Sequence, residues 1–343
     1  MAPFSCIQLD FKPNNFNIMP IKASAPQREK LRLFVTGATG YIGCVLVEHA
    51  IVEGYDVYGL SRTEKGDATL RALGASAVRG DLATIDILRR ESAEADAVIH
   101  LARIYEPNMD WDEVLRIEAA AMDAIGESLR GTRKPLILTS GTGLAAADPA
   151  GGETTEESPI AEGENPLLKR IHIERHGLGL SASGIRVSAI RLPPYVYGRG
   201  GGRGFVTVLM QMALKAGESV YIGDGALRLS SVHVDDAVRL YLLAARQAKS
   251  GEVFNGAAST HLTQREIAEA VGKVLDIPVC AIHLEEAEAR WGRFAVMFFN
   301  RENRASSVKA VRELGWHPKE IDLITDITVG GYVPVAKKLR ESI

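Results

Sequence analysis

The stretch LFVTGATGYIG at residues 33–43 decides the fold, because an apolar strand runs directly into a glycine turn and a helix. Its three glycines, Gly37, Gly40 and Gly43, have the spacing G-x-x-G-x-x-G. Glycine permits a tight turn and lets backbone N–H groups at a helix N-terminus approach a pyrophosphate. The stretch therefore predicts a dinucleotide-binding loop. We expect its contacts to come from Gly37, Thr39, Gly40, Tyr41 and Ile42.

From residue 31 onward, short apolar runs alternate with stretches of helical spacing. This alternation is typical of parallel strands that are joined by crossover helices. The sequence predicts an α/β fold, with a doubly wound parallel sheet of the Rossmann type and a smaller C-terminal lobe that binds the substrate. Strands are expected at residues 31–37, 55–62, 75–82, 95–102, 134–141 and 185–193, and a long helix at 111–129.

The alternation weakens after residue 193, which suggests how the chain is divided. A glycine loop and helix at 201–217, a strand and helix at 230–247 and an amphipathic helix at 262–275 follow. The polar segment 147–166 lacks periodicity and predicts a loop over the site. We expect an N-terminal extension at 1–30, a cofactor domain at 31–192 to which 229–255 return, and a substrate lobe at 193–228 and 256–343.

Composition excludes several classes of function. The chain has 343 residues, of which 46% are hydrophobic and 24% charged, as in ordinary globular proteins. A net charge of -3 provides no broad positive field, so we expect neither nucleic acid nor a membrane surface as partner. The three cysteines, Cys6, Cys44 and Cys280, are too scattered for a disulfide framework or a zinc site. We therefore expect a cytoplasmic protein without a metal site.

The end of the second predicted strand indicates which dinucleotide is bound. It reads Leu60-Ser61-Arg62, with Lys65 close behind and no acidic residue at the strand end. An acidic residue here binds the ribose hydroxyls of NAD, whereas arginine accommodates the 2′-phosphate of NADP. Arg62 stands about twenty residues after the glycine loop, as the motif requires. The alternative is a solvated basic turn; we expect Ser61 and Arg62 to select NADP(H).

Together with the glycine loop, five further segments resemble the short-chain dehydrogenase/reductase superfamily, in its extended and atypical epimerase/dehydratase-like branch. They are VIHLA (98–102), LTSGTG (138–143), RLPPYVYG (191–198), VHVDDA (232–237) and ELGWHP (313–318). The resemblance covers residues 31–318. It implies contacts with adenine from Asp81 and Leu82, a cofactor cleft lined by Leu101 and Ala102, and nicotinamide contacts from Pro193 and Val196.

The catalytic half of the site departs from this resemblance. The superfamily usually carries Tyr-x-x-x-Lys, in which the lysine lowers the pKa of the tyrosine that transfers a proton. When Glu174 is matched to the glutamate that commonly follows this pair, Arg170 occupies the lysine position and Pro166 the tyrosine position. Arginine can still supply a charge and hold the ribose, but proline has no proton to give. Gly141 stands where a hydroxyl residue is usual.

Other residues could replace the missing proton donor. Thr142 or Ser140 could polarise a substrate carbonyl. Tyr105, after the fourth strand, could reach the nicotinamide from the other side, and we weigh this equally against loop packing. A third option is that His172 and His176 act as acid and base, but we favour the interpretation that they lie on an exposed helix face. The candidate catalytic residues are therefore Thr142, Ser140, Tyr105 and Arg170.

Three functions remain open. The first is an NADP(H)-dependent oxidoreductase that reduces a carbonyl or other polarised double bond of a small organic molecule, and the intact cofactor half favours it. The second is a redox-neutral isomerase, lyase or cyclase that keeps NADP(H) as scaffold or transient hydride store. The third is a module that senses NADP without turnover. A homodimer is an option that no sequence feature requires.

An apolar substrate would suit the C-terminal half of the chain, which is rich in methionine and aromatic residues. Such a stripe is more often core than pocket. The candidate lining residues are Met210, Met212, Trp291, Phe294, Met297, Phe298 and Phe299.

Overall fold

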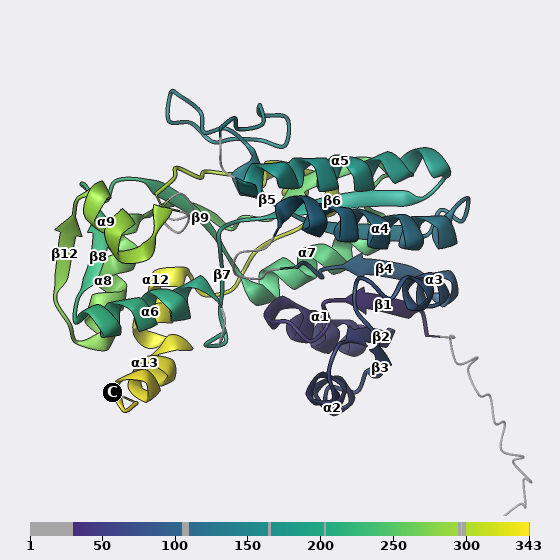
Figure 1. The fold of residues 1–343 in the computed structure, drawn as a ribbon, viewed down its shortest axis with the longest axis horizontal. Coiled ribbons are helices and arrows are strands. Elements are labelled where there is room, and N and C mark those ends of the chain that lie inside the picture. Colours follow the sequence, from purple (N-terminus) through teal and green to yellow (C-terminus); the bar gives the residue numbers. More distant parts are fainter. Residues whose placement is uncertain are drawn as a thin grey trace, which may run out of the picture. The chain divides into compact units, whose positions relative to one another are not determined.

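Seven parallel strands form the main sheet of the computed structural model, which describes residues 30–104, 110–163, 166–201, 204–293, 296 and 300–342. Their order is β3-β2-β1-β4-β5-β6-β10 (Figure 1). The order runs outward in both directions from the pair β1 and β4, as in a doubly wound sheet. The strands are β1 Arg32–Thr36, β2 Asp56–Ser61, β3 Ser76–Arg79, β4 Ala97–His100, β5 Pro135–Gly141, β6 Arg186–Leu192 and β10 Glu252–Asn255.

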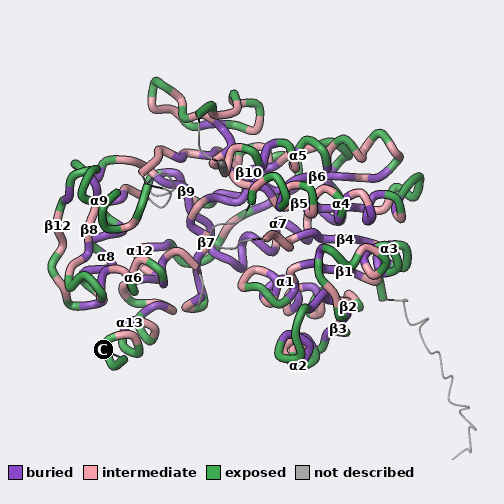
Figure 2. Tube along the Cα trace, in the orientation of Figure 1, coloured by how far each residue is buried: buried purple, intermediate pink, exposed green. Residues whose placement is uncertain are grey.

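Helices cover both faces of this sheet, because its strands are apolar on both sides. On β1, Leu33 and Val35 enter one core while Phe34 enters the other. The first core is completed by α1 Tyr41–Val52, α2 Glu64–Ala72, α7 Val234–Gln247 and α11 Val308–Leu314. The second is completed by α3 Ile85–Glu94, α4 Trp111–Leu129 and α5 Arg170–Gly179. Figure 2 shows buried residues along the strands and exposed residues on the outer sides of α2 and α3.

Two small sheets and several helices form the C-terminal lobe (Figure 1). One sheet contains β7 Tyr195–Tyr197, β9 Arg228–His233 and β11 Ser259–Thr263, and the other β8 Ser219–Ile222 and β12 Val279–Ile282. The helices are α6 Phe205–Ala216, α8 Gln264–Leu275, α9 Leu284–Trp291, α12 Leu323–Val329 and α13 Tyr332–Arg340. The predicted α/β fold with a smaller C-terminal lobe is thus confirmed.

Contacts cross between the predicted parts of the chain. Strand β9 pairs with β7 and β11, whereas β10, which follows after α7, joins the main sheet. Helix α11 and the fully buried Trp316 pack in the same core as α7, and the Trp316 indole donates to the Asp236 carbonyl at 2.9 Å. The bounds of the cofactor domain and the lobe stay a prediction.

The polar segment predicted as a loop forms only turns and isolated bridges over residues 147–163. It is fastened to the lobe: Thr154 N–H donates to the Arg304 carbonyl at 2.8 Å, and Thr260 donates to Glu153 at 2.6 Å. The segment follows β5 in the chain, and these hydrogen bonds therefore connect the end of β5 to residues 300–306.

Candidate functional site

The glycine turn brings β1, β4 and the start of α1 close together. Gly37 has φ +72°, and a Cβ there would lie 2.7 Å from the backbone nitrogen of Ala102. A Cβ at Gly43 would lie 2.1 Å from the Gly37 carbonyl oxygen. The turn thus packs against Leu101 and Ala102 with no room for side chains. It leaves the N-terminus of α1, whose first turn has no acidic residue, as a suitable site for an anion.

The other predicted loop residues extend this turn in two directions. Thr39 lies beside Gly66 at the start of α2. Tyr41 and Ile42 begin α1, and the Tyr41 hydroxyl donates to the Gly198 carbonyl at 2.7 Å. Burial raises the pKa of Tyr41, so its phenol stays protonated. This hydrogen bond ties the cofactor turn to the glycine loop that follows β7.

The predicted ribose residues lie at the end of β2. Ser61 is buried and donates to the Thr63 carbonyl at 3.0 Å, while Arg62 is exposed. Sequence reasoning missed a carboxylate here: Asp67 of α2, which forms a 2.5 Å ion pair with Arg79 at the end of β3. The hydrogen bond from Arg79 lowers the pKa of Asp67. The acid is therefore already bound to a cation.

Asp81 and Leu82 follow β3. An Asp81 carboxylate oxygen accepts from the backbone N–H groups of Ala83 and Thr84 at 2.9 and 3.0 Å. Leu82 is buried in the second core. Asp81 thus holds the turn at the edge where adenine is expected.

Thr142 and Ser140 lie at the end of β5 and are both buried. The Thr142 hydroxyl donates to the Asn303 side-chain oxygen at 2.9 Å, across 161 residues of sequence. Asn303, itself buried, was missed by sequence reasoning because no local pattern relates it to Thr142. In this arrangement the single proton of Thr142 points at Asn303.

Arg170, the residue predicted to occupy the lysine position, is buried and paired. Its guanidinium lies 3.1 Å from Glu118 of α4, and the same carboxylate accepts from the Ile104 N–H at 3.0 Å. Both side chains of the ion pair are less than a tenth exposed. The pair connects α5 to α4 and partly neutralises the arginine charge. The sequence did not reveal Glu118 as the partner of Arg170.

The remaining candidates are placed as follows. Tyr105 lies outside the described residues. His172 is exposed, and His176 forms an exposed 2.7 Å pair with Asp123, as expected of a helix surface. His100 is buried with its ring 2.9 Å from the Thr36 hydroxyl, and burial lowers its pKa to about 4. These contacts favour structural roles for His100 and His176.

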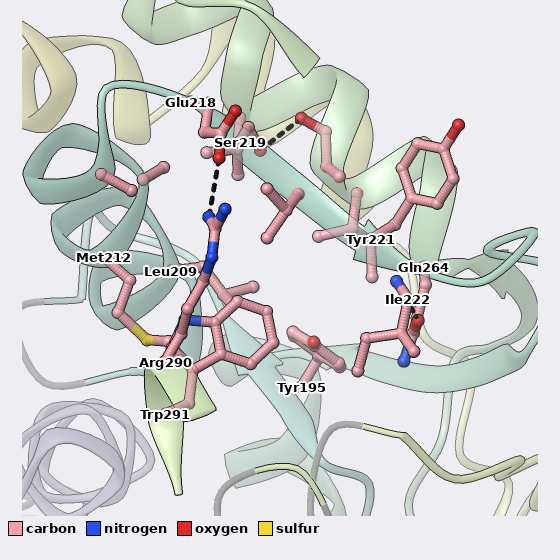
Figure 3. Close-up of a pocket in the computed structure, with 16 residues that line it drawn as sticks. Tyr195, Leu209, Met212, Glu218, Ser219, Tyr221, Ile222, Gln264, Arg290 and Trp291 are labelled. Atoms are coloured by element: carbon pink, nitrogen blue, oxygen red, sulfur yellow. Dashed lines mark hydrogen bonds and ion pairs between the residues drawn. The ribbon is translucent and has the colours of Figure 1, made fainter. Parts of the chain in front are cut away.

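Strand β7 leads from the main sheet to a cavity in the lobe. Pro193, just before it, is buried, and Val196 is half-buried. The cavity lies between α6, β8, α8 and α9 and includes Met212 and Trp291 (Figure 3). Met210 instead lies in the lobe's core. The four other candidates at 294 and 297–299 lie outside the described residues.

Among the described residues, no group of three or more His, Cys, Asp or Glu side chains is placed to hold a metal ion. Within the same residues, no helix has the length and apolar character that a membrane span requires.

The parallel sheet, the glycine turn at its carboxyl edge and the attached lobe define a Rossmann-type enzyme that binds a nicotinamide dinucleotide. Residues 33–257 match the model of the NAD dependent epimerase/dehydratase family. The chain belongs to this family, the extended branch of the short-chain dehydrogenases/reductases, and is an NAD(P)-dependent enzyme.

Several relatives share nearly the whole chain. An uncharacterized protein of Schizosaccharomyces pombe is 36% identical over 302 residues, which are 88% of this chain and 100% of that protein. The 4-hydroxy-2-methyl-3-oxo-4-farnesyl-3,4-dihydroquinoline-1-oxide ketoreductase of Stigmatella aurantiaca is 26% identical over 313 residues, 83% of this chain and 92% of that one. The UDP-glucose 4-epimerase structure from Thermotoga maritima with UDP-glucose has a TM-score of 0.72 at 21% identity, covering 90% and 100%.

Proposed function

We propose that the protein is an NADP(H)-dependent oxidoreductase that reduces a carbonyl or another polarised double bond of a small, fairly apolar organic molecule. The observation that carries this proposal is the end of β2. There Arg62 is exposed beside the buried Ser61, while the nearby carboxylate of Asp67 is bound by Arg79. A 2′-phosphate would meet a cation there, and the nearby acid is already paired.

The cofactor would lie across the carboxyl ends of the strands. Its pyrophosphate would bind at the N-terminus of α1, its adenine beside the turn after β3, and its nicotinamide near the start of β7. The residues assigned to it are Gly37, Thr39, Gly40, Tyr41, Ile42, Ser61, Arg62, Asp81, Leu82, Leu101, Ala102, Pro193 and Val196. Arg170 is assigned to the ribose, a role in which its guanidinium would be shared with Glu118.

The substitution Arg62→Glu tests the cofactor. It removes the phosphate's cation and adds a repelling charge, so NADPH should bind about 10- to 100-fold more weakly while NADH binding changes little. Fluorescence titration with both nucleotides measures this. Lys273→Glu, which reverses an exposed charge on α8 in the C-terminal lobe, is the control for general charge effects. An unchanged preference for NADPH in Arg62→Glu would refute the assignment.

Thr142 is the proposed donor to the substrate carbonyl. The orientation of the Asn303 side-chain amide determines whether Thr142 can donate. As placed, the Asn303 oxygen accepts the Thr142 proton. If the amide is turned over, its NH₂ donates to Thr142 instead, and a substrate oxygen then competes for the Thr142 proton only with the Leu192 carbonyl at 3.4 Å. Ser140 offers a second hydroxyl at the same strand end.

Thr142→Val should lower kcat about 100- to 1000-fold, the usual loss when one carbonyl-polarising donor is removed. NADPH affinity should stay the same. The reaction is followed by NADPH absorbance with a carbonyl substrate identified by screening, and Ser140→Ala is measured beside it. Full activity of Thr142→Val would transfer the role to Ser140 or Tyr105.

A redox-neutral reaction is the second candidate, because Pro166 occupies the tyrosine position and the charge of Arg170 is paired with Glu118. The ketoreductase name of one relative supports reduction, and the epimerase names of others support this alternative. Product mass distinguishes them. Reduction adds two hydrogens, whereas isomerisation leaves the mass unchanged and dehydration removes water.

A further inference from the structure

The cavity in the C-terminal lobe has an apolar wall and a volume of about 60 Å³ (Figure 3). An enclosed cavity of roughly 150 Å³ holds a benzene molecule, so this one fits a group of a few non-hydrogen atoms. Aliphatic side chains from α6 and α8 supply most of the wall, and Trp291 closes one side. The aliphatic residues are Leu209, Met212, Ala213, Ile267, Ala268 and Val271.

The hydroxyl of Tyr195 in this wall has no hydrogen-bond partner among the described residues. Tyr195 of β7 is only 4% exposed, and Figure 3 shows its hydroxyl facing the cavity. Among the described residues, this hydroxyl makes no hydrogen bond. Tyr197, two residues along the same strand, donates to the Ile321 carbonyl at 2.8 Å. A ligand atom in the cavity that accepts the Tyr195 proton would form a hydrogen bond that the described residues do not supply.

The charged groups of the wall neutralise each other. Arg290 lies 2.7 Å from Glu218, and Figure 3 shows this pair at one side of the cavity. The Ser219 hydroxyl is occupied by the Ala268 carbonyl at 2.8 Å. Burial raises the pKa of Tyr195, so its phenol is a neutral hydrogen-bond donor. The lining therefore suits an uncharged group.

We propose that this cavity binds an uncharged, apolar segment of the substrate, and that the Tyr195 hydroxyl donates a hydrogen bond to a carbonyl or ether oxygen in that segment. Tyr195 follows Pro193, the proposed nicotinamide neighbour, by two residues, so the start of β7 connects the cavity wall to the expected reaction centre. The inference rests on the proposed function, because it assigns the cavity to the substrate of that reaction.

Two small probes that differ in one group test this assignment without cofactor or turnover. They are 2-butanone and 2-methyl-1-butene, in which CH₂ replaces the ketone oxygen. Ligand-observed NMR titration of the full chain gives both dissociation constants. In Tyr195→Phe, the preference for the ketone over the alkene should fall about tenfold, the effect of one hydrogen bond. A preference equal to that of the unchanged protein would overturn the proposal.

Two further variants serve as controls for this test. Tyr197→Phe removes a hydroxyl from the same strand outside the cavity, so it should leave the preference intact. Met212→Trp fills the cavity and should abolish binding of both probes; retained binding would place them elsewhere. Displacement of 2-butanone by uridine diphosphate would contradict an uncharged ligand. The proposed cofactor is judged separately, by NADPH binding to Arg62→Glu.

Discussion

The substitution Gly43→Ala is expected to destabilise the protein by about 1–3 kcal/mol and to weaken NADPH binding more than tenfold. The added methyl group would lie 2.1 Å from the Gly37 carbonyl oxygen and 2.8 Å from Ala38 backbone atoms. Backbone atoms cannot rotate away as a side chain would, so α1 must move off the turn. That movement displaces the N–H groups that are proposed to bind the pyrophosphate.

Gly179→Ala is the matched control for Gly43→Ala. A Cβ at Gly179 meets no atom within 4 Å, and the residue is exposed at the end of α5. Alanine is favoured over glycine in a helix by about 0.5–1 kcal/mol, so this variant should be as stable as the original or more so. Urea unfolding and NADPH titration measure both variants. Tight NADPH binding by Gly43→Ala would show that the loop does not hold the cofactor as proposed.

The substitution Arg191→Met is expected to cost about 3–5 kcal/mol of unfolding free energy. Arg191 of β6 and Glu174 of α5 form a two-point ion pair at 2.5 and 2.9 Å, and both side chains are at most 5% exposed. Arg191 also donates to the Glu156 carbonyl at 3.3 Å. Without the arginine, the Glu174 carboxylate stays buried with no compensating charge.

The double variant Arg191→Met, Glu174→Met separates this cause from simple loss of packing. Removing both charges should recover part of the lost stability, because no uncompensated ion remains. Lys169→Met breaks an exposed pair with Asp112 and should have little effect, since solvent screens exposed pairs. Urea unfolding measures all three. Equal stability of the single and double variants would contradict the explanation.

Much of the main sheet could be predicted because its signals are local. The strand-turn-helix at residues 33–43 depends on the spacing of its apolar residues and on Gly37, which adopts a φ of +72°. The helix expected at 111–129 has those bounds in α4, since its burial repeats at helical spacing. Strand β9 could not be assigned to its sheet in this way, because pairing with β7 and β11 depends on distant residues.

The sequence by itself determined the Rossmann sheet, the glycine turn and the arginine after β2, and it predicted the loss of the Tyr-x-x-x-Lys pair. Only the tertiary structure decided that Thr142 meets Asn303, that Arg170 meets Glu118 and that the Tyr195 hydroxyl faces a cavity. The physical reason is the separation along the sequence over which each kind of interaction acts. Periodicity and backbone angles act over a few residues, whereas hydrogen bonds and cavities form between side chains that folding brings together from anywhere in the chain.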